Sequence, residues 1–361
     1  MKLTCKNLGG EFVIEVSNNT EAEIKKVIGT QVQVHPHRIV LFPWDGVDYG
    51  VIIQPPQWKL LDWIPLERLS WQYLSHNPRA ISLLQQYPER IDWVMLSVNS
   101  EGIPFLKENP DKIVWYQLAA NSSPDAIPLL EDYLENGGGE EGRFTNKNQH
   151  YLFWTRLSGN PNALPLLEKY IQHIKWYDLL NNNPSPDLIP FLQKHMDEHE
   201  IVGHVSHHSH AIKLIEKHEN YINWSKLSKN PNAIHLLENH IDRIDWWELH
   251  SSPNVIPMLE KHADKITWWH TLCENEHAMP ILLKHRDKIN WHFFCNNTSP
   301  IAMELIEQNL NRIDSDINLE SSQDGLALSK NPSALPLLSR HPELIQWHVL
   351  AKHPEIFEWV E

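Results

Sequence analysis

The feature that most constrains the fold of this chain is a tryptophan that recurs at nearly constant spacing. Most neighbouring pairs are 22 residues apart, as Trp224 and Trp246 are. A period of about 20 to 50 residues is typical of repeat arrays, whose units stack on one another and bind partners along a surface. The repeating tryptophans are Trp71, Trp93, Trp115, Trp154, Trp176, Trp224, Trp246, Trp268, Trp291 and Trp347.

Each unit carries further recurring residues that predict two short helices. The pair Asn230-Pro231 is a typical helix start, because Asn caps free N–H groups and Pro fits the first helical position. Apolar residues follow it at near-helical spacing for about three turns. A shorter helix is predicted to begin at the tryptophan. Two units have Val202 or Gly325 in place of the tryptophan, so we count twelve units in residues 64–361.

A large flat side chain at one repeat position is expected to fill the gap between consecutive units, so the tryptophans are predicted to be core residues. The residues that follow them should form a column along one face of the stack. This column either pads the contact between repeats or presents an aromatic stripe to a protein partner, where Trp and Tyr often anchor binding. Its members include Tyr116, Tyr177, Trp247, Trp269 and His292.

Histidines form two groups. One lies in a degenerate repeat at 196–212, where His204, His207, His208 and His210 have a spacing that could present imidazoles to a metal ion. A solvated repeat is the interpretation we favour, since a structural metal site needs four well-placed ligands. In the other group each histidine sits six residues before the next tryptophan. There it is expected to bind helix C-terminal carbonyls, with a pH-responsive series as the alternative. This group is His218, His240, His262, His285 and His341.

The repeat pattern is absent from the first 55 residues. Leu3 to Ser17 is predicted to form a hairpin around Gly9-Gly10, followed by a helix from Thr20 to Ile28. Two more strands are predicted, at 39–42 and 51–53. A hairpin, one helix and two strands is the element order of a β-grasp domain.

These residues resemble ubiquitin in their spacing, over about 15% of the chain. The resemblance implies an integral ubiquitin-like module, because the exposed glycine pair that permits conjugation is missing. It also implies an apolar recognition patch at Leu8, at Val40 or Leu41, and at Ile52 or one of its neighbours. The domain is expected either to bind a partner or only to cap the open end of the array, since open solenoids need caps.

Residues 64–361 resemble the tryptophan- and Asn-Pro-containing repeat families of giant nucleocytoplasmic DNA viruses. The segment that carries the resemblance is L-S-x-N-P-x-A-I-x-L-L, as at 227–237. It implies a viral protein that acts in the cytoplasm of an infected cell. It implies no catalytic residues.

Composition excludes several classes of function. The chain has 46 Asp and Glu against 31 Lys and Arg, a net charge of −15, which argues against binding a phosphate backbone. No apolar run is long enough to span a membrane. Three cysteines and an N-terminus without a secretory hydrophobic region suggest the cytoplasm. Cys273 and Cys295 occupy a small-residue position of the repeat.

The sequence therefore predicts an α+β protein with three parts. These are a β-grasp domain at 1–55, a linker at 56–63 and an α-solenoid at 64–361, with a mobile loop insertion at 135–150 and degenerate repeats near 196–212 and 313–332. No nucleotide-binding, esterase or metalloprotease motif is present, so no catalytic residue and no cofactor is expected. The predicted function is a non-enzymatic adaptor for host or viral proteins. The alternative is a virion or assembly component that associates with itself.

Overall fold

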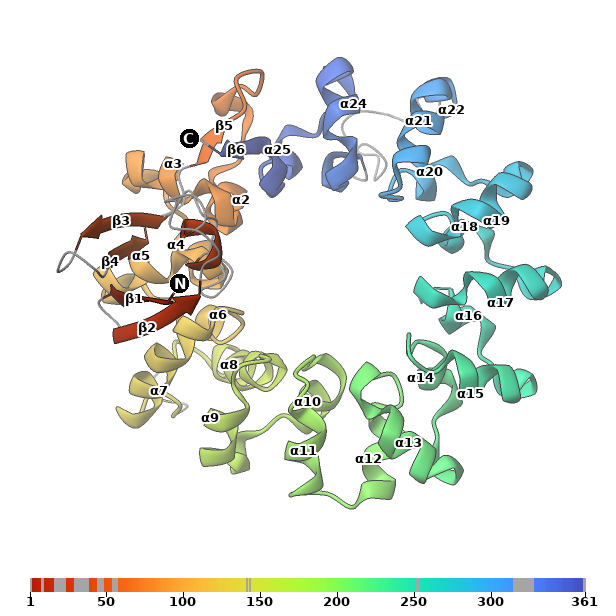
Figure 1. Cartoon of the computed structure of the whole chain (residues 1–361), viewed down its shortest axis with the longest axis horizontal. Helices are drawn as coiled ribbons and strands as arrows, with labels where there is room; N and C mark the ends of the chain where they lie inside the picture. Colours follow the sequence, from red (N-terminus) through yellow and green to blue (C-terminus); the bar gives the residue numbers. More distant parts are fainter. Residues whose placement is uncertain are drawn as a thin grey trace. The chain divides into compact units, whose positions relative to one another are not determined.

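The structure is a computed structural model that describes residues 2–7, 10–15, 24–28, 39–43, 49–53, 58–140, 142, 144–250, 253–313 and 328–359. It divides into two units. The first contains residues 1–61 and 357–361, and the second contains residues 62–356. The fold is α+β and mostly helical, with many short helices that repeat along the second unit (Figure 1).

The first unit contains a mixed sheet of four strands: β1 (Lys2–Asn7), β2 (Gly10–Glu15), β3 (Ile39–Pro43) and β4 (Tyr49–Ile53). The order is β2-β1-β4-β3, in which β1 pairs antiparallel with β2 and parallel with β4. Residues 24–28 are helical, and Ile24 and Ile28 are buried. The predicted hairpin and the two later strands are therefore present.

The predicted linker at 56–63 is wrong in part, because it contains a strand. β5 (Trp58–Leu60) pairs antiparallel with β6 (Phe357–Trp359) near the C-terminus of the chain. The partner strand is about 300 residues away in sequence, so no local pattern in 56–63 could have indicated the pairing.

The unit around Trp224 shows how the sequence specifies a repeat. α14 (Trp224–Ser228) begins where the Asn223 side chain accepts a hydrogen bond from the Lys226 N–H. Asn230 starts the next element in the same way, accepting from the Asn232 N–H at 3.0 Å. The helix that follows is shorter than predicted. A turn leads into the six-residue α15 (Ile234–Asn239), whose Leu236 and Leu237 are buried.

The same plan recurs through the second unit. Helices that begin at the tryptophan are α2 (Trp71–His76), α4 (Trp93–Val98), α6 (Trp115–Leu118), α10 (Trp176–Asn182), α14, α16 (Trp246–Leu249), α18 (Trp269–Leu272), α20 (Trp291–Phe294) and α25 (Trp347–Leu350). Two helices start earlier, α8 (Lys147–Gly159) and α12 (Glu198–Val205). The second helices are α3 (Ile81–Gln86), α5 (Ile103–Glu108), α7 (Ile127–Glu135), α9 (Leu164–Lys169), α11 (Leu188–Gln193), α13 (Ile212–Lys217), α15, α17 (Ile256–Lys261), α19 (Met279–Lys284), α21 (Pro300–Gln308) with α22 (Leu310–Ile313), and α24 (Leu335–Arg340).

A 3-10 turn precedes most of these helices. Those before the second helices are η3 (Pro78–Ala80), η5 (Ser100–Gly102), η7 (Pro124–Ala126), η10 (Ser209–Ala211), η13 (Pro253–Val255), η15 (Glu276–Ala278) and η18 (Pro332–Ala334). In the last repeat the corresponding turn, η20 (Pro354–Ile356), leads into β6. Those before the tryptophans are η2 (Leu66–Arg68), η4 (Pro88–Arg90), η6 (Pro110–Lys112), η9 (Ile171–His173), η11 (Glu219–Tyr221), η12 (Ile241–Arg243), η14 (Ala263–Lys265), η16 (Arg286–Lys288) and η19 (Pro342–Leu344).

Consecutive repeats are joined by buried asparagine side chains that we call the asparagine ladder. The Nδ2 of Asn99 donates to the carbonyls of Ser75 and Asn77 in the preceding repeat, both at 3.0 Å. Its Oδ1 accepts from the Glu101 N–H. Because each amide thus satisfies three backbone groups, it both starts a helix and fixes the neighbouring repeat. Ladder positions with this bonding are Asn77, Asn99, Asn121, Asn160, Asn183, Asn230, Asn297 and Asn331.

The ladder joins the last repeat of the second unit to its first. Asn77 donates to the carbonyls of Ala351 at 3.1 Å and His353 at 2.9 Å. Arg79 forms an ion pair with Glu355 at 2.9 Å. Residues 62–356 thus form a closed array, in which α2 lies beside α25 (Figure 1). The expected open-ended array is corrected, and a closed array has no terminal repeat that would need a cap.

The structure also corrects the predicted position of the repeating tryptophan in the Trp268-Trp269 pair. In six of the tryptophan repeats a Ser or Cys four positions after the tryptophan donates to its carbonyl, as the Oγ of Ser97 does to Trp93. Cys273 makes this contact with Trp269 and not with Trp268. Trp269 therefore occupies the repeating tryptophan position, and His270 takes its place in the column. Cys273 and Cys295 are buried at the small-residue position, as predicted.

Segment 135–150 was predicted to be a mobile loop, but its glycines Gly138 and Gly139 pack closely on neighbouring side chains, whereas Glu140, Gly142 and residues 145–148 are exposed. Gly137 has a φ of 76°, and the Gly138 N–H donates to the Tyr133 carbonyl at 2.8 Å, an arrangement that ends α7. A Cβ on Gly139 would come within 2.8 Å of the Trp154 ring. α8 already begins at Lys147. The glycines thus allow the chain to pass close to Trp154.

The degenerate repeat at 196–212 forms α12 and η10, while residues 314–327 lie outside the described part of the chain. Within the described residues, every helix is too short or too polar to traverse a lipid bilayer.

Candidate functional site

The repeating tryptophans are half-buried, with Trp154 as a fully buried member at 1% exposure. The prediction that they are core residues therefore holds only in part. Trp224 packs against His240 with ring centroids 4.8 Å apart, and the Arg243 guanidinium lies over the Trp224 ring, 5.2 Å from its centroid. The tryptophan is thus covered by residues of its own unit as well as by the stack.

The second histidine group owes its position to these tryptophans. His240, His262 and His285 each follow the last residue of a second helix, as predicted. Their rings, however, pack on the tryptophan of the same unit, at 4.8, 5.4 and 4.9 Å between centroids. Tyr87 and Tyr170 occupy the equivalent position beside Trp71 and Trp154. Aromatic packing on the tryptophan explains why either His or Tyr can occupy this position.

The column residues lie on the helices that begin at the tryptophan. In Figure 1 these helices form the inner side of the closed array, and the second helices form its outer side. Tyr177 is 77% exposed and Trp247 is 49% exposed. Tyr116 and His292 are half-buried. Tyr116 is covered by Arg156, whose guanidinium is 5.3 Å from the ring centroid. Solvent exposure therefore varies from one column residue to the next.

The densest part of the column is a cluster on α16, α18 and α20 that we call the aromatic patch. His270 lies between Trp247 and Phe293, with ring centroids 6.0 and 5.1 Å away. Trp268 is 3% exposed and supports Trp247 from below at 6.5 Å. The patch combines a rigid buried base with exposed ring edges. Its members are Trp247, His250, Trp268, His270, His292 and Phe293.

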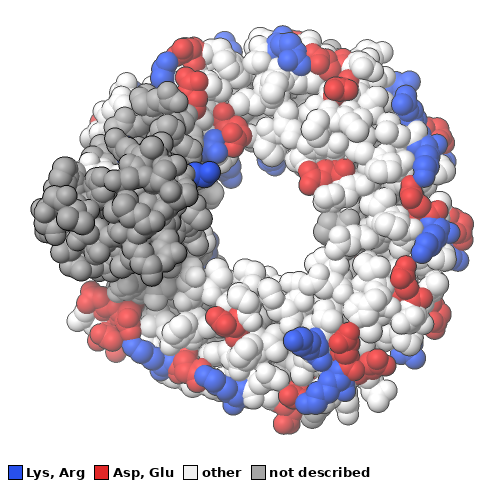
Figure 2. Space-filling view, viewed as in Figure 1, with Lys and Arg blue, Asp and Glu red and all other residues white. Residues whose placement is uncertain are grey.

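Charge is distributed unequally around the array. On the face that Figure 2 shows, Lys, Arg, Asp and Glu are gathered along the outer side, whereas the part of the inner rim not covered by grey atoms carries few charged residues. Ion pairs between successive second helices account for part of the outer charge, as in Glu260–Lys284 at 2.5 Å and Glu307–Arg340 at 2.8 Å. The inner side is therefore suited to a partner that contributes apolar or neutral polar groups.

The first histidine group does not assemble a metal site. His207 and His208 are neighbours with ring centroids 4.3 Å apart, and the His208 Nε2 contacts the Leu180 carbonyl at 3.1 Å. Burial lowers the pKa of His207 to about 4 and also lowers that of His208. Among the described residues, His204 and His210 included, no group of three or more His, Cys, Asp or Glu side chains is placed to hold a metal ion.

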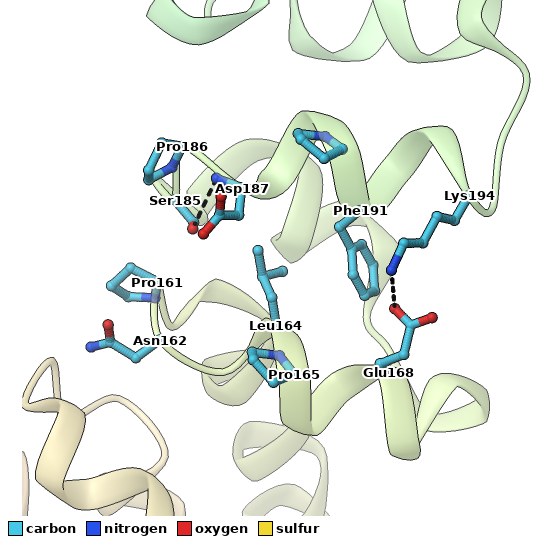
Figure 3. A pocket seen from close by; sticks show the side chains of 11 residues that line it. Pro161, Asn162, Leu164, Pro165, Glu168, Ser185, Pro186, Asp187, Phe191 and Lys194 are labelled. Carbon is cyan, nitrogen blue, oxygen red and sulfur yellow. Dashed lines mark hydrogen bonds and ion pairs between the residues drawn. The ribbon is translucent and has the colours of Figure 1, made fainter.

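A groove on the outer side was not indicated by the sequence. It has a volume of about 750 Å³ and lies between α9 and α11 (Figure 3). Leu164 and Phe191 form its apolar part, and a Lys194–Glu168 ion pair of 3.9 Å closes one side. The signal that could have revealed it is the proline in both helices, Pro165 and Pro190, which line it with Pro161 and Pro186.

The predicted recognition patch of the first unit is described only in part. Val40 and Ile52 are direct partners in the β3–β4 register. Leu41 pairs with Val51 and is half-buried. Leu8 lies outside the described residues.

The asparagine ladder is the main feature that sequence reasoning missed. Asn was interpreted only as a helix cap before Pro. It recurs where no proline follows, as in Asn99-Ser100, Asn121-Ser122 and Asn297-Thr298. The presence of Asn at this position without a following Pro was the sequence signal that it does more than cap a helix.

Comparison with known proteins assigns no identity to the chain. Neither a protein family, nor a curated protein, nor a solved structure gave a match.

Proposed function

We propose that this protein is a non-enzymatic adaptor whose closed array holds a protein partner on its inner side. The observation that carries the proposal is the aromatic patch, in which Trp247 is 49% exposed above the buried Trp268. Exposed Trp and His on a rigid base lose little conformational freedom on binding, which favours their use as anchors. The small number of charged residues on the visible part of the inner rim supports an apolar or neutral polar contact surface (Figure 2).

We also propose that residues 1–55 are a ubiquitin-like β-grasp domain that can contribute to partner binding. Support comes from the strand order β2-β1-β4-β3 and from the helical residues 24–28 between the two hairpins. A viral origin and action in the host cytoplasm belong to the same proposal, and rest on the resemblance of the repeats alone.

The test is affinity capture with the full chain from expressing cells, followed by binding measurements with the protein that is captured. Trp247→Ala should weaken binding at least about tenfold, the loss expected for a central aromatic anchor. Tyr221→Ala is the matched control, because Tyr221 is 53% exposed and lies outside the patch. Leu8→Ala reports on the first unit.

Two outcomes would contradict this proposal, one for the binding site and one for the function. If Trp247→Ala and Tyr221→Ala bind equally well, the patch is not the partner site. If the chain captures only itself, the alternative of an assembly component is favoured instead.

A further inference from the structure

In the contact that closes the array, a histidine holds one of the two ladder positions and starts a 3-10 turn with its side chain. We call it the closing contact, formed by residues 351–355 of the last repeat and 77–79 of the first. On the side of the first repeat it uses the usual asparagine, Asn77. On the side of the last repeat the ladder position is His353, which is 5% exposed.

His353 performs the helix-start role with an imidazole. Its Nδ1 accepts a hydrogen bond from the Glu355 N–H at 3.2 Å, where Asn uses a side-chain oxygen that never binds a proton near neutrality. To accept this bond the ring must be neutral and carry its proton on Nε2. Protonation of Nδ1 would remove the acceptor and leave the Glu355 N–H without it.

The surroundings oppose a charge on this ring. Arg79 approaches from η3, while Lys330 and Lys352 line the same hollow as His353 beside η18 and η20. Glu355 is the acidic group nearby, and its carboxylate is engaged by Arg79. Burial lowers the pKa of His353, with the Asn331 carbonyl and Glu355 acting in the opposite direction. Burial and Lys352 likewise lower the pKa of His76 on α2.

The same short segment supplies the acceptors that hold the first repeat. The His353 carbonyl accepts from Asn77, and the Pro354 carbonyl accepts from Arg79 at 3.3 Å. A shift of η20 after loss of the bond at its start would therefore weaken both sides of the closing contact together.

We propose that acidification opens the array at the closing contact, and that His353 is the proton-sensing residue. The open form exposes the imidazole and binds the proton more tightly, so falling pH shifts the population toward it. This device does not depend on the identity of any partner of the inner side.

His208 provides an internal comparison, since it is a histidine at the same ladder position far along the array. It contacts the Leu180 carbonyl through Nε2, but its side chain makes no hydrogen bond that starts η10. Protonation of His208 therefore removes no helix-start bond.

The experiment is hydrogen exchange of the full chain at about pH 7.5 and about pH 5, corrected for intrinsic exchange rates. In the wild type, residues 71–80 and 347–356 should exchange at least about tenfold faster at the lower pH. His353→Asn installs the residue used elsewhere in the ladder and should abolish that response. His208→Asn should leave it intact.

The proposal is overturned if exchange in these two segments does not respond to pH, or if the response survives in His353→Asn. If His353→Asn does not fold, Asn77→Ala tests the contact from the other side. It should give fast exchange of residues 347–356 already at about pH 7.5, with little further increase on acidification. Slow exchange at pH 7.5, or an undiminished response to acid, in Asn77→Ala would equally overturn the proposal.

Discussion

Trp154 and Trp224 occupy the same position of two repeats, yet the first is fully buried and the second is half-exposed. Around Trp154 the chain adds Phe153, at 5.2 Å between ring centroids, His173, stacked at 4.4 Å, and the close approach of Gly139. Around Trp224 the ring contact is with His240, and the Arg243 guanidinium lies over the ring. The repeat fixes the position of the tryptophan, and neighbouring residues outside the repeat pattern determine how much of its side chain is exposed to solvent.

The asparagine ladder is the same in both repeats. Asn160 and Asn230 each donate two hydrogen bonds to the preceding repeat and accept one at the start of a helix. The asparagine hydrogen bonds therefore contribute to stability in the same way in both repeats, whereas the contribution of the tryptophan depends on its burial.

The largest expected effect is that of Trp154→Ala. Emptying a fully buried aromatic site costs about 3–5 kcal/mol, so the urea midpoint of this variant should fall the most. A loss below that of Trp224→Ala would contradict the difference in burial.

Asn160→Ala and Asn230→Ala should follow, with similar losses of about 2–4 kcal/mol, because each leaves three buried or partly buried backbone groups without their partner. Equilibrium unfolding of the two variants checks this. If one variant lost almost no stability, the asparagine ladder would not contribute equally in the two repeats.

Gly139→Ala should destabilise the protein by about 1–3 kcal/mol, because its Cβ would press on the Trp154 ring and force the packing to shift. Gly142→Ala is the control, since a Cβ there meets no atom within 4 Å. Equal thermal stability of the two variants would mean that the glycine segment leaves Trp154 uncovered in solution.

Trp224→Ala should cost less, about 1–2 kcal/mol, in proportion to its partial burial. Replacement by Phe should recover part of the loss through packing on His240. Chemical denaturation of both variants measures the difference, and a cost equal to that of Trp154→Ala would refute the idea that local cover matters.

The smallest effect concerns the repeat that lies between these two in sequence. Burial lowers the pKa of His207 to about 4, whereas an unfolded chain has a histidine pKa of about 6.5. Since the unfolded chain binds the proton more tightly, stability present above about pH 6.5 is lost as the pH falls toward 4. His207 is partly exposed, so the loss should be modest. His207→Asn should flatten the dependence of the urea midpoint on pH across this window, and an unchanged slope would exclude His207 as its source.

The sequence indicated which residues belong to the column, but not how their side chains contact one another. The column after the tryptophans was identified, including the exposed Tyr177 and Trp247. The patch itself could not be, because the contacts among Trp247, His270 and Phe293 join three repeats. The doublet Trp268-Trp269 illustrates the difficulty: a spacing of 22 from Trp246 selects the first, whereas the Cys273 contact selects the second.

The sequence by itself determined the repeat, its two helices and the residues that start them, because a period and a helix cap act over a few residues of the chain. It also determined the small-residue position of Cys273 and Cys295. Only the tertiary structure decided that the array closes, that β5 pairs with β6, and that Gly139 covers Trp154. Closure depends on the small rotation between neighbouring repeats added over the whole array, and no single unit encodes that sum.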